Sequence, residues 1–335
     1  MRRTIRDVSN RAGVSVGTVS NVLNAPHLVS EETRSRVLEA IDALGYRPNR
    51  AARSLQAKKT YLIGYRLTDA GLSPALDVFL HRLVRTATDH GFDMTLFAPR
   101  PGQSDLDAYR EVIRAGNVDG FILSETNYTD PRVEMLTELS FPFVAFGRAR
   151  HEKPFPWVDV DGARGMAEVV DHLHQQGHRR IALIAWPEGS QTGDARVQGY
   201  LQGLKRAQLP VEPDLIVRCE NLYSAARAAA EAILDQPNPP TAVAAVQDEM
   251  ALGVVAAALT RGIEVGRDVA ITGFDDSQAA AVAWPGLTSV RQPFEEVARS
   301  LVDLLVDRLT QPEAEPGGVM LAPQLVVRAS SGGIR

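Results

Sequence analysis

The sequence predicts a multidomain α+β protein, with a three-helix head at the N-terminus, a short linker, and two Rossmann-like α/β lobes. Three observations predict this architecture. Residues 5–44 hold three short segments with helical spacing of apolar residues, separated by turn residues. Residues 48–59 are polar and contain no glycine. From residue 61 onward, apolar runs of strand length alternate with amphipathic runs of helix length, which is typical of parallel sheets covered by helices.

The first two helices are expected within residues 4–24. Thr4 and Asp7 have the spacing of a capping box, so a helix should begin directly after Thr4 and end at a glycine turn. Ser15 is placed to cap a second helix, which should end at Asn24. Two short helices joined by a glycine turn favour a helix-turn-helix, whose second helix fits the major groove of DNA. Because short apolar stripes are common, the pattern alone leaves a plain helical hairpin as an alternative.

A third helix should begin after Ser30, with two glutamates in its first turn, where the helix dipole favours acidic groups. Its inner face is expected to hold Val37, Leu38, Ile41 and Leu44. The head is therefore predicted to span residues 1–47. The linker that follows, residues 48–60, is rich in helix formers but too short and polar to be a stable helix by itself.

Residues 61–335 are expected to form the two lobes. A first series of strands and helices runs to a crossing near residues 158–162, and a second series runs to a return crossing at 288–292. We assign about 61–158 and 292–320 to the N-lobe, and about 159–288 and 321–335 to the C-lobe. Ligands of such sheets lie off the carboxyl ends of the strands, which predicts a cleft between the lobes.

Charge separates the head from the rest of the chain. The formal net charge is -5, yet residues 1–60 carry a balance of +6 and the remainder one of -11. A basic head on an acidic body suits a head that binds nucleic-acid phosphates and a body that does not. Cys219 is the only cysteine, which excludes a disulfide framework and a cysteine cluster for zinc. No segment has the pattern of a signal peptide or the length of a membrane span, so we expect a cytoplasmic protein with no membrane partner.

The head and linker carry a more specific signal. The stretch AGVSVGTVSNVLN at 12–24 is followed by Ser-Glu-Glu-Thr-Arg at 30–34 and by Gly-Tyr-Arg-Pro-Asn at 45–49. In this order the residues resemble the LacI/GalR family of bacterial transcription regulators, and later motifs extend the resemblance over nearly the whole chain. The resemblance implies a DNA-binding head, a linker that becomes a hinge helix when paired with its dimer mate on DNA, and lobes of the periplasmic-binding-protein type around an effector cleft.

The resemblance also implies which residues meet DNA. Val16, Gly17 and Asn21 stand where relatives read base edges, although Gly17 offers no side chain. Leu55 corresponds to a leucine that relatives insert into the minor groove, an apolar wedge that kinks the duplex; packing of Leu55 on the body is the alternative. The expected DNA-binding residues are Thr4, Ser15, Val16, Gly17, Thr18, Ser20, Asn21, Asn24, Tyr46, Asn49, Arg50, Ala52, Arg53 and Leu55.

Six residues of the body match positions of the family's effector cleft, namely Asp69, Arg148, Arg196, Tyr223, Asp248 and Asp275. Carboxylates and arginines that bind neighbouring hydroxyls, together with an aromatic face, are the groups that hold a sugar. Asp248 could equally be the cap of the helix that follows it. Two departures, Gln247 where relatives have asparagine and the distinctive stretch 186–193, mean that no single relative's ligand carries over.

No catalytic motif competes with this interpretation, because the chain has neither a Gly-x-Ser-x-Gly motif, nor a P-loop, nor a Rossmann glycine fingerprint. His172, His174 and His178 lack the spacing of a metal site, so we expect no metal and no cofactor. The sequence predicts a DNA-binding transcriptional regulator, most simply a repressor, that acts as a homodimer or dimer of dimers on double-stranded operator DNA. Its expected effector is a sugar; a nucleobase, a co-effector protein and, more distantly, a sugar-transport role are the alternatives.

Overall fold

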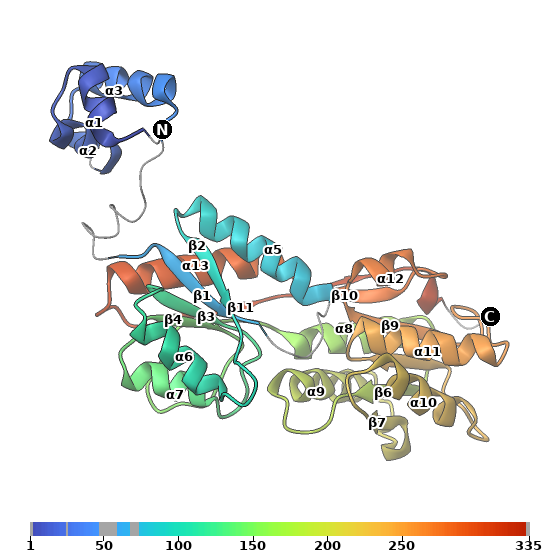
Figure 1. Ribbon diagram of the computed structural model, residues 1–335. Coiled ribbons are helices and arrows are strands. Elements are labelled where there is room, and N and C mark those ends of the chain that lie inside the picture. The colour runs from blue at the N-terminus through green and yellow to red at the C-terminus, as the bar shows by residue number, and fades with distance from the viewer. Residues whose placement is uncertain (1–2, 25, 47–58, 68–73, 333–335) are drawn as a thin grey trace. The chain divides into compact units, whose positions relative to one another are not determined.

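The computed structural model describes residues 3–24, 26–46, 59–67 and 74–332. The chain divides into two compact units, residues 1–61 and 62–335, which we call the head and the body (Figure 1). In the described ranges no helix is long and apolar enough to span a membrane. The predicted fold class, a helix-turn-helix head followed by two α/β lobes, is confirmed.

The head packs three helices around a small apolar core. Its elements are α1 (Ile5–Ala12), α2 (Val16–Asn24), the 3-10 turn η1 (Pro26–Leu28) and α3 (Glu31–Leu44). The amide of Asp7 donates to the Thr4 hydroxyl, and the Asp7 carboxylate accepts from the Thr4 amide at 2.8 Å, so the capping box is present. Gly13 ends α1 with φ 64°, a left-handed conformation that a side chain would strain. The buried core residues are Val8, Ala12, Val19, Val22, Val37, Ala40 and Tyr46.

One expected core residue of α3 is wrong. Leu38 is 43% exposed, whereas Val37 and Ala40 are buried. Successive residues of a helix lie about 100° apart, so Val37 shares its face with the residues three and four positions further on, and Leu38 is turned away from them.

The N-lobe is a six-stranded parallel sheet in the order β11-β5-β4-β3-β1-β2. Its strands are β1 (Leu62–Arg66), β2 (Asp93–Phe97), β3 (Gly120–Leu123), β4 (Phe143–Phe146), β5 (Trp157–Val160) and β11 (Gly318–Leu321). Helices α5 (Pro74–Asp89) and α13 (Phe294–Thr310) pack together on one face, and α6 (Asp105–Arg114) and α7 (Pro131–Glu138) cover the other (Figure 1).

The C-lobe is a second six-stranded sheet, in the order β12-β10-β9-β8-β6-β7, parallel except at β12. Its strands are β6 (Ile181–Ala185), β7 (Ile216–Arg218), β8 (Ala242–Ala245), β9 (Ala270–Asp275), β10 (Thr288–Arg291) and β12 (Gln324–Val326). The covering helices form two pairs, α8 (Gly162–Gln175) with α9 (Gln191–Arg206) and α10 (Tyr223–Leu234) with α11 (Asp248–Thr260); α12 (Gln278–Val282) and the 3-10 turns η2 (Pro213–Leu215) and η3 (Ala329–Ser331) complete it. A Cβ at Gly199 of α9 would clash with the backbone of Ala163, so this glycine permits the close approach of α8 and α9.

Two segments expected as crossings between the lobes are strands. Residues 157–160 form β5 beside β4, and residues 288–291 form β10 beside β9. Two further strands close to the C-terminus of the chain, β11 and β12, were not predicted. β11 pairs with β5 and β12 pairs with β10, and each forms an edge of its sheet. The chain therefore passes between the lobes after β5, after β10 and after β11.

Candidate functional site

Both sheets have a point where the strand order reverses. In the N-lobe β1 lies between β2 and β3, and in the C-lobe β6 lies between β7 and β8. Adjacent crossovers then run on opposite faces, which leaves a crevice at the carboxyl ends of these strands. The chain places Arg66 and the loop 124–130 at this point of the N-lobe, and Trp186 and Asp248 at this point of the C-lobe.

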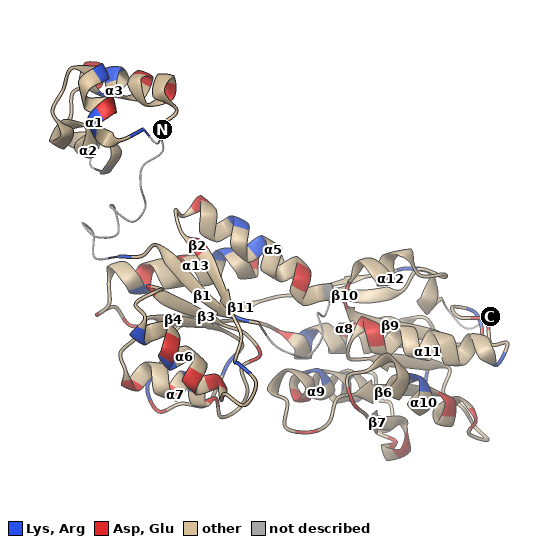
Figure 2. Cartoon of the chain, in the orientation of Figure 1, with Lys and Arg blue, Asp and Glu red and all other residues tan. Residues whose placement is uncertain are grey.

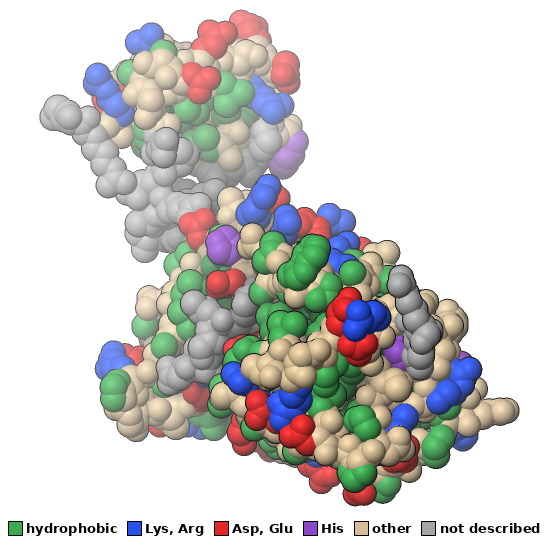
Figure 3. Space-filling model, turned by 90° about the vertical axis from the view of Figure 1, so that its right-hand side faces the viewer, with side chains coloured by type: hydrophobic (Ala, Val, Ile, Leu, Met, Phe, Trp, Pro, Cys, Tyr) green, Lys and Arg blue, Asp and Glu red, His purple; other side chains and the backbone are tan. Residues whose placement is uncertain are grey.

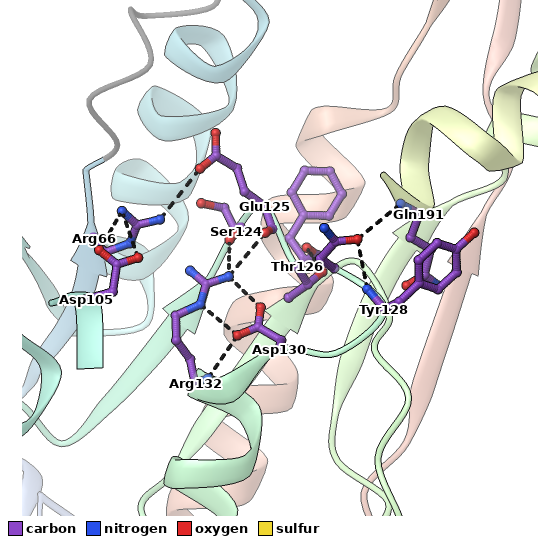
Figure 4. Close-up of polar contacts among 11 residues, drawn as sticks. Arg66, Asp105, Ser124, Glu125, Thr126, Tyr128, Asp130, Arg132 and Gln191 are labelled. Carbon is purple, nitrogen blue, oxygen red and sulfur yellow. Dashed lines mark hydrogen bonds and ion pairs between the residues drawn. The ribbon is translucent and has the colours of Figure 1, made fainter. Parts of the chain in front are cut away.

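In the N-lobe, a buried ion pair fixes the loop 124–130. The guanidinium of Arg132 donates to both carboxylate oxygens of Asp130, at 2.9 and 2.6 Å, and Nη2 also donates to the carbonyl of Ser124 at 3.0 Å (Figure 4). The side chains of this pair are 7% and 4% exposed. Glu125, at φ 54°, occupies a conformation rare for a side-chain-bearing residue, and the Arg132 bonds on either side of it hold it there. The loop is therefore rigidly placed.

The same loop contacts the C-lobe. The hydroxyl of Tyr128 donates to Asp194 at 3.2 Å, and the side-chain oxygen of Asn127 accepts from the amide of Gln191 at 3.4 Å. Both partners belong to the first turn of α9. The guanidinium of Arg150 lies 4.9 Å from the centre of the Tyr128 ring, which it stacks against. Loop 124–130 therefore bridges the two lobes.

Beside this bridge lies a polar cavity of about 550 Å³. The N-lobe lines this cavity with Tyr128 and Arg148. The C-lobe lines it with Glu188, Gly189, Gln191, Asp194, Ala195, Val197, Gln198 and Arg218. Its guanidinium groups are engaged, Arg148 with Asp159 at 2.8 Å and Arg218 with Asp194 at 3.5 Å. We call this the outer cavity.

Arg196 is the centre of a buried cluster in the C-lobe. Its guanidinium lies 3.7 Å from the centre of the Phe274 ring and 5.1 Å from that of Trp186, and it pairs with Asp275 at 3.5 Å. It also donates to the carbonyl of Val246, at the end of β8. The Nε of Arg196 and the indole Nε1 of Trp186 are buried and find no hydrogen-bond partner among the residues that the structure describes. Two donors thus remain for a ligand.

Two carboxylates complete this cluster. Asp248 accepts from the Ser289 hydroxyl at 2.5 Å and from the Ser277 amide at 2.6 Å. Burial, with a smaller contribution from the nearby charge of Asp275, raises the pKa of Asp248 to about 7. Asp275 accepts from Gln292 at 2.6 Å, and its burial likewise raises its pKa, while Arg196 acts in the opposite direction. Burial lowers the pKa of Arg196, although the surrounding carboxylates oppose this. We call Arg196, Asp248, Asp275, Trp186 and Phe274 the inner cluster.

In the head, α2 presents short uncharged side chains to solvent. Val16 is 40% exposed, and Gly17 and Asn21 are exposed as well. The hydroxyl of Ser15 accepts from the amide of Thr18 at 3.0 Å, which confirms the predicted cap of this helix. Figure 2 shows that α2 carries no charged residue, whereas α1 and α3 carry both signs. A helix of this kind can approach base edges but contributes no cation for phosphates.

Comparisons with known proteins decide the family. Residues 4–49 match the description "Bacterial regulatory proteins, lacI family", and residues 170–331 match "Periplasmic binding protein-like domain". The HTH-type transcriptional regulator CelR of Thermobifida fusca is 35% identical over 337 residues, which covers 98% of this chain and 98% of that protein. The chain belongs to the LacI family.

Solved structures of LacI-family proteins agree with this over the full length. A CelR–cellobiose complex is 33% identical with a TM-score of 0.74, and covers 98% of this chain and 100% of that chain. The lac repressor dimer bound to operator and the anti-inducer ONPF is 28% identical with a TM-score of 0.79. This match covers 99% of this chain and 100% of that chain. The protein is a LacI-family DNA-binding transcriptional regulator rather than an enzyme, as the sequence predicted.

The predicted effector residues fall into three groups. Arg196, Asp248 and Asp275 come together in the inner cluster, and Arg148 lines the outer cavity. Tyr223 begins α10, is 40% exposed and lines neither site. Asp69 lies outside the described residues, as do five predicted DNA-binding residues: Asn49, Arg50, Ala52, Arg53 and Leu55.

Tyr46, another expected DNA-binding residue, is 9% exposed and packs in the head core. The sequence did not point to Asp159, Tyr128 or Asp194. It singled out Trp186 only as part of the distinctive stretch 186–193, which forms the loop between β6 and α9 and the start of α9. Among the histidines, His172 contacts the Ser331 hydroxyl and His178 contacts Thr241 and the Gly332 carbonyl, and in the described part of the chain no group of three potential ligands surrounds a metal position.

Proposed function

We propose that this LacI-family regulator senses a sugar at the inner cluster, and that the sugar controls its affinity for operator DNA. The observation that carries the proposal is the pairing of Arg196 with Asp275, between two aromatic rings and near the carboxylate of Asp248, at the carboxyl ends of the C-lobe strands. Carboxylates accept from sugar hydroxyls, an arginine donates to neighbouring hydroxyl oxygens, and rings pack on the apolar face of a pyranose. Two unpaired donors in the cluster support this role.

The proposal for DNA recognition follows from the charge pattern of the head. Because α2 has no cation, we assign base reading to Val16 and Asn21 and phosphate contacts to arginines elsewhere. Arg6 and Arg11 of α1 are exposed, and the linker arginines belong to residues outside the described ranges. Affinity that depends on such contacts falls steeply with salt concentration.

We further propose that the functional unit is a homodimer. The lac repressor of similar fold is a dimer on its operator. On the side of α11 and α12, apolar side chains are exposed among charged ones (Figure 3). Trp284 and Val282 lie at the end of α12. They are 90% and 74% exposed, more than any other large hydrophobic residue in the described part of the chain. A large exposed aromatic of this sort is a common anchor of protein interfaces.

A ligand screen tests the effector proposal. The full-length protein is melted with a panel of mono- and oligosaccharides, and with purine and pyrimidine bases and nucleosides as the competing class. A ligand of the folded state raises the melting temperature, by an amount set by its concentration relative to Kd. We expect stabilisation by sugars that is lost when Arg196 and Asp275 are replaced together. Stabilisation by bases alone would refute the sugar assignment.

A further inference from the structure

We propose that residues 328–332 form an acid-sensitive clasp on the C-lobe, which neutral His172 and His178 hold closed and which opens when these rings take up protons. The segment follows the edge strand β12 and contains the single turn η3. We call residues 328–332 the clasp. Its proposed opening does not depend on the identity of the effector.

Buried hydroxyl groups hold the clasp against β9 and β10. The Ser330 hydroxyl donates to the carbonyl of Ile271 at 2.6 Å and accepts from the amide of Thr288 at 2.8 Å. The Thr288 hydroxyl accepts from the amide of Arg328 at 2.7 Å and donates to its carbonyl at 3.0 Å. Opening exchanges these bonds for bonds to water, which changes the free energy little for each bond. The clasp is therefore a part of the C-lobe that can open locally.

Two histidines hold the other side of the clasp. Nε2 of His172 lies 2.8 Å from the Ser331 hydroxyl, and Nε2 of His178 donates to the carbonyl of Gly332 at 3.1 Å. Because its proton is then on Nε2, the neutral His178 ring accepts at Nδ1 from the Thr241 hydroxyl, 3.0 Å away. A second proton would fall on Nδ1 and displace the hydrogen of that hydroxyl. The closed clasp is therefore matched to the neutral ring.

The surroundings disfavour a charge on either ring. His178 is 2% exposed and His172 is half-buried. Burial lowers the pKa of both rings, the hydrogen bonds to the clasp oppose this, and the charges of His178 on His172 and of Arg179 on His178 lower each pKa further. Among the described residues no carboxylate acts on either ring. Carboxylates of the packed elements pair elsewhere: Asp171 with Arg206, Asp276 with Arg328, and Asp268 with Arg267.

Acidification should therefore open the clasp. A group whose pKa is lower in the folded state stabilises it at high pH, and this contribution is lost as the pH falls through the unfolded value, about 6.5 for histidine. At pH 5.5 a released ring is protonated about ten times more often than it is neutral, so each ring favours opening by up to about tenfold relative to pH 7.5. Asp248 shifts the global stability in the opposite direction, so the measurement has to be local.

Opening of the clasp would also free the segment that follows α12. The amide of Ser330 donates to the carbonyl of Gly286 at 3.1 Å, and the guanidinium of Arg328 donates to the carbonyl of Leu287 at 2.7 Å. These carbonyls come shortly after Trp284, the proposed anchor of the homodimer. Acid should therefore weaken the dimer. This consequence, unlike the clasp itself, rests on the proposed homodimer.

Hydrogen exchange read by mass spectrometry tests the clasp in the full-length protein at pH 7.5 and pH 5.5, with rates corrected for the pH dependence of chemical exchange. The double variant His172→Gln with His178→Gln removes both titrating rings and keeps side-chain amides that can donate to the clasp. His174→Gln is the matched control, because His174 lies on the same helix and its buried Nδ1 has no hydrogen-bond partner among the described residues. Amides of β3 in the N-lobe serve as an internal reference.

We expect the wild-type amides of the clasp to exchange at least tenfold faster at pH 5.5 than at pH 7.5, and those of the double variant to change less than twofold. His174→Gln should behave as the wild type, and the amides of β3 should respond in none of the proteins. If the double variant does not fold, His172→Gln alone should lower the wild-type response at least threefold.

A wild-type response below twofold would overturn the clasp, as would an equal response in the double variant or, where that variant does not fold, in His172→Gln. Sedimentation of the same samples tests the consequence for the dimer, which should dissociate more readily at pH 5.5 in the wild type but not in the double variant. A dimer equally tight at both pH values with an open clasp would overturn the link to α12. A protein that is monomeric at pH 7.5 would refute the homodimer and this link together, while the exchange result still decides the clasp.

Discussion

Removal of one partner from the Arg196–Asp275 pair should destabilise the body. Both side chains are nearly inaccessible, 4% and 6% exposed, and lie 3.5 Å apart. Breaking a buried pair by removing one partner costs about 3–5 kcal/mol, because the other charge is left uncompensated. In Arg196→Ala, Asp275 keeps its 2.6 Å bond from Gln292, so we expect about 3–4 kcal/mol. For a body of this size that is a fall in melting temperature of roughly 6–15 °C.

The matched variant removes both charges. Arg196→Met with Asp275→Asn keeps most of the side-chain volume and leaves neither partner charged, so we expect less than half of the single variant's loss. Calorimetry of the full chain at pH 8 and pH 5.5 provides a second check. Without Arg196 the pKa of Asp275 should rise further, and a folded state that binds a proton more tightly than the unfolded chain gains stability as the pH falls. The deficit of Arg196→Ala should therefore shrink at pH 5.5.

Two results would refute this reasoning. One is a melting temperature of Arg196→Ala within about 2 °C of the wild type at pH 8. The other is a double variant as unstable as the single one, since that would place the cost in lost packing against Phe274 rather than in the uncompensated charge.

Three further perturbations have defined outcomes. Because the pKa of Asp248 is raised to about 7, the folded state holds a proton that the unfolded chain releases near pH 4. The free energy of unfolding should therefore fall by up to about 4 kcal/mol as the pH rises from 4 to 7. Asp248→Asn should flatten that dependence in urea unfolding, and an unchanged slope would contradict the assignment. Arg132→Met leaves Asp130 buried without its partner and should cost about 3–5 kcal/mol, with faster amide exchange in loop 124–130; unchanged exchange would separate the loop from the pair. Trp284→Ser should shift the protein from dimer to monomer in light scattering without changing its circular dichroism, and a variant still dimeric at micromolar concentration would place the interface elsewhere.

The sequence predicted the regular elements well where local chemistry decides them. The Thr4–Asp7 capping box and the Ser15 cap need only neighbouring residues, and both are present. It missed β11 and β12, which are three or four residues long and exist because their partners β5 and β10 present open edges. Leu38 was misplaced because apolar character alone does not say which side of a helix a residue occupies.

The inner cluster was predicted in part, because the resemblance supplied Arg196, Asp248 and Asp275 by position. It could not supply their burial or the long-range partners that set their charge state, such as Ser289 and Gln292. The sequence predicted a cleft between the lobes and one residue of the outer cavity, Arg148, but not the rest of its lining. Most of that lining comes from α9 and the loop before it, and its meeting with the N-lobe residues depends on the placement of the whole sheets.

The central claim is that a ligand at the inner cluster controls operator binding. Its most direct test is fluorescence anisotropy of a labelled near-palindromic operator, titrated with full-length protein with and without a saturating sugar chosen by its rise in melting temperature. The account predicts that this sugar changes the wild-type operator Kd at least fivefold, the lower end of typical allosteric coupling. The variant with Arg196→Met and Asp275→Asn should bind operator within threefold of the wild type and ignore the sugar. A wild-type operator Kd that no stabilising sugar moves, or a variant that responds at wild-type concentrations, would contradict the claim.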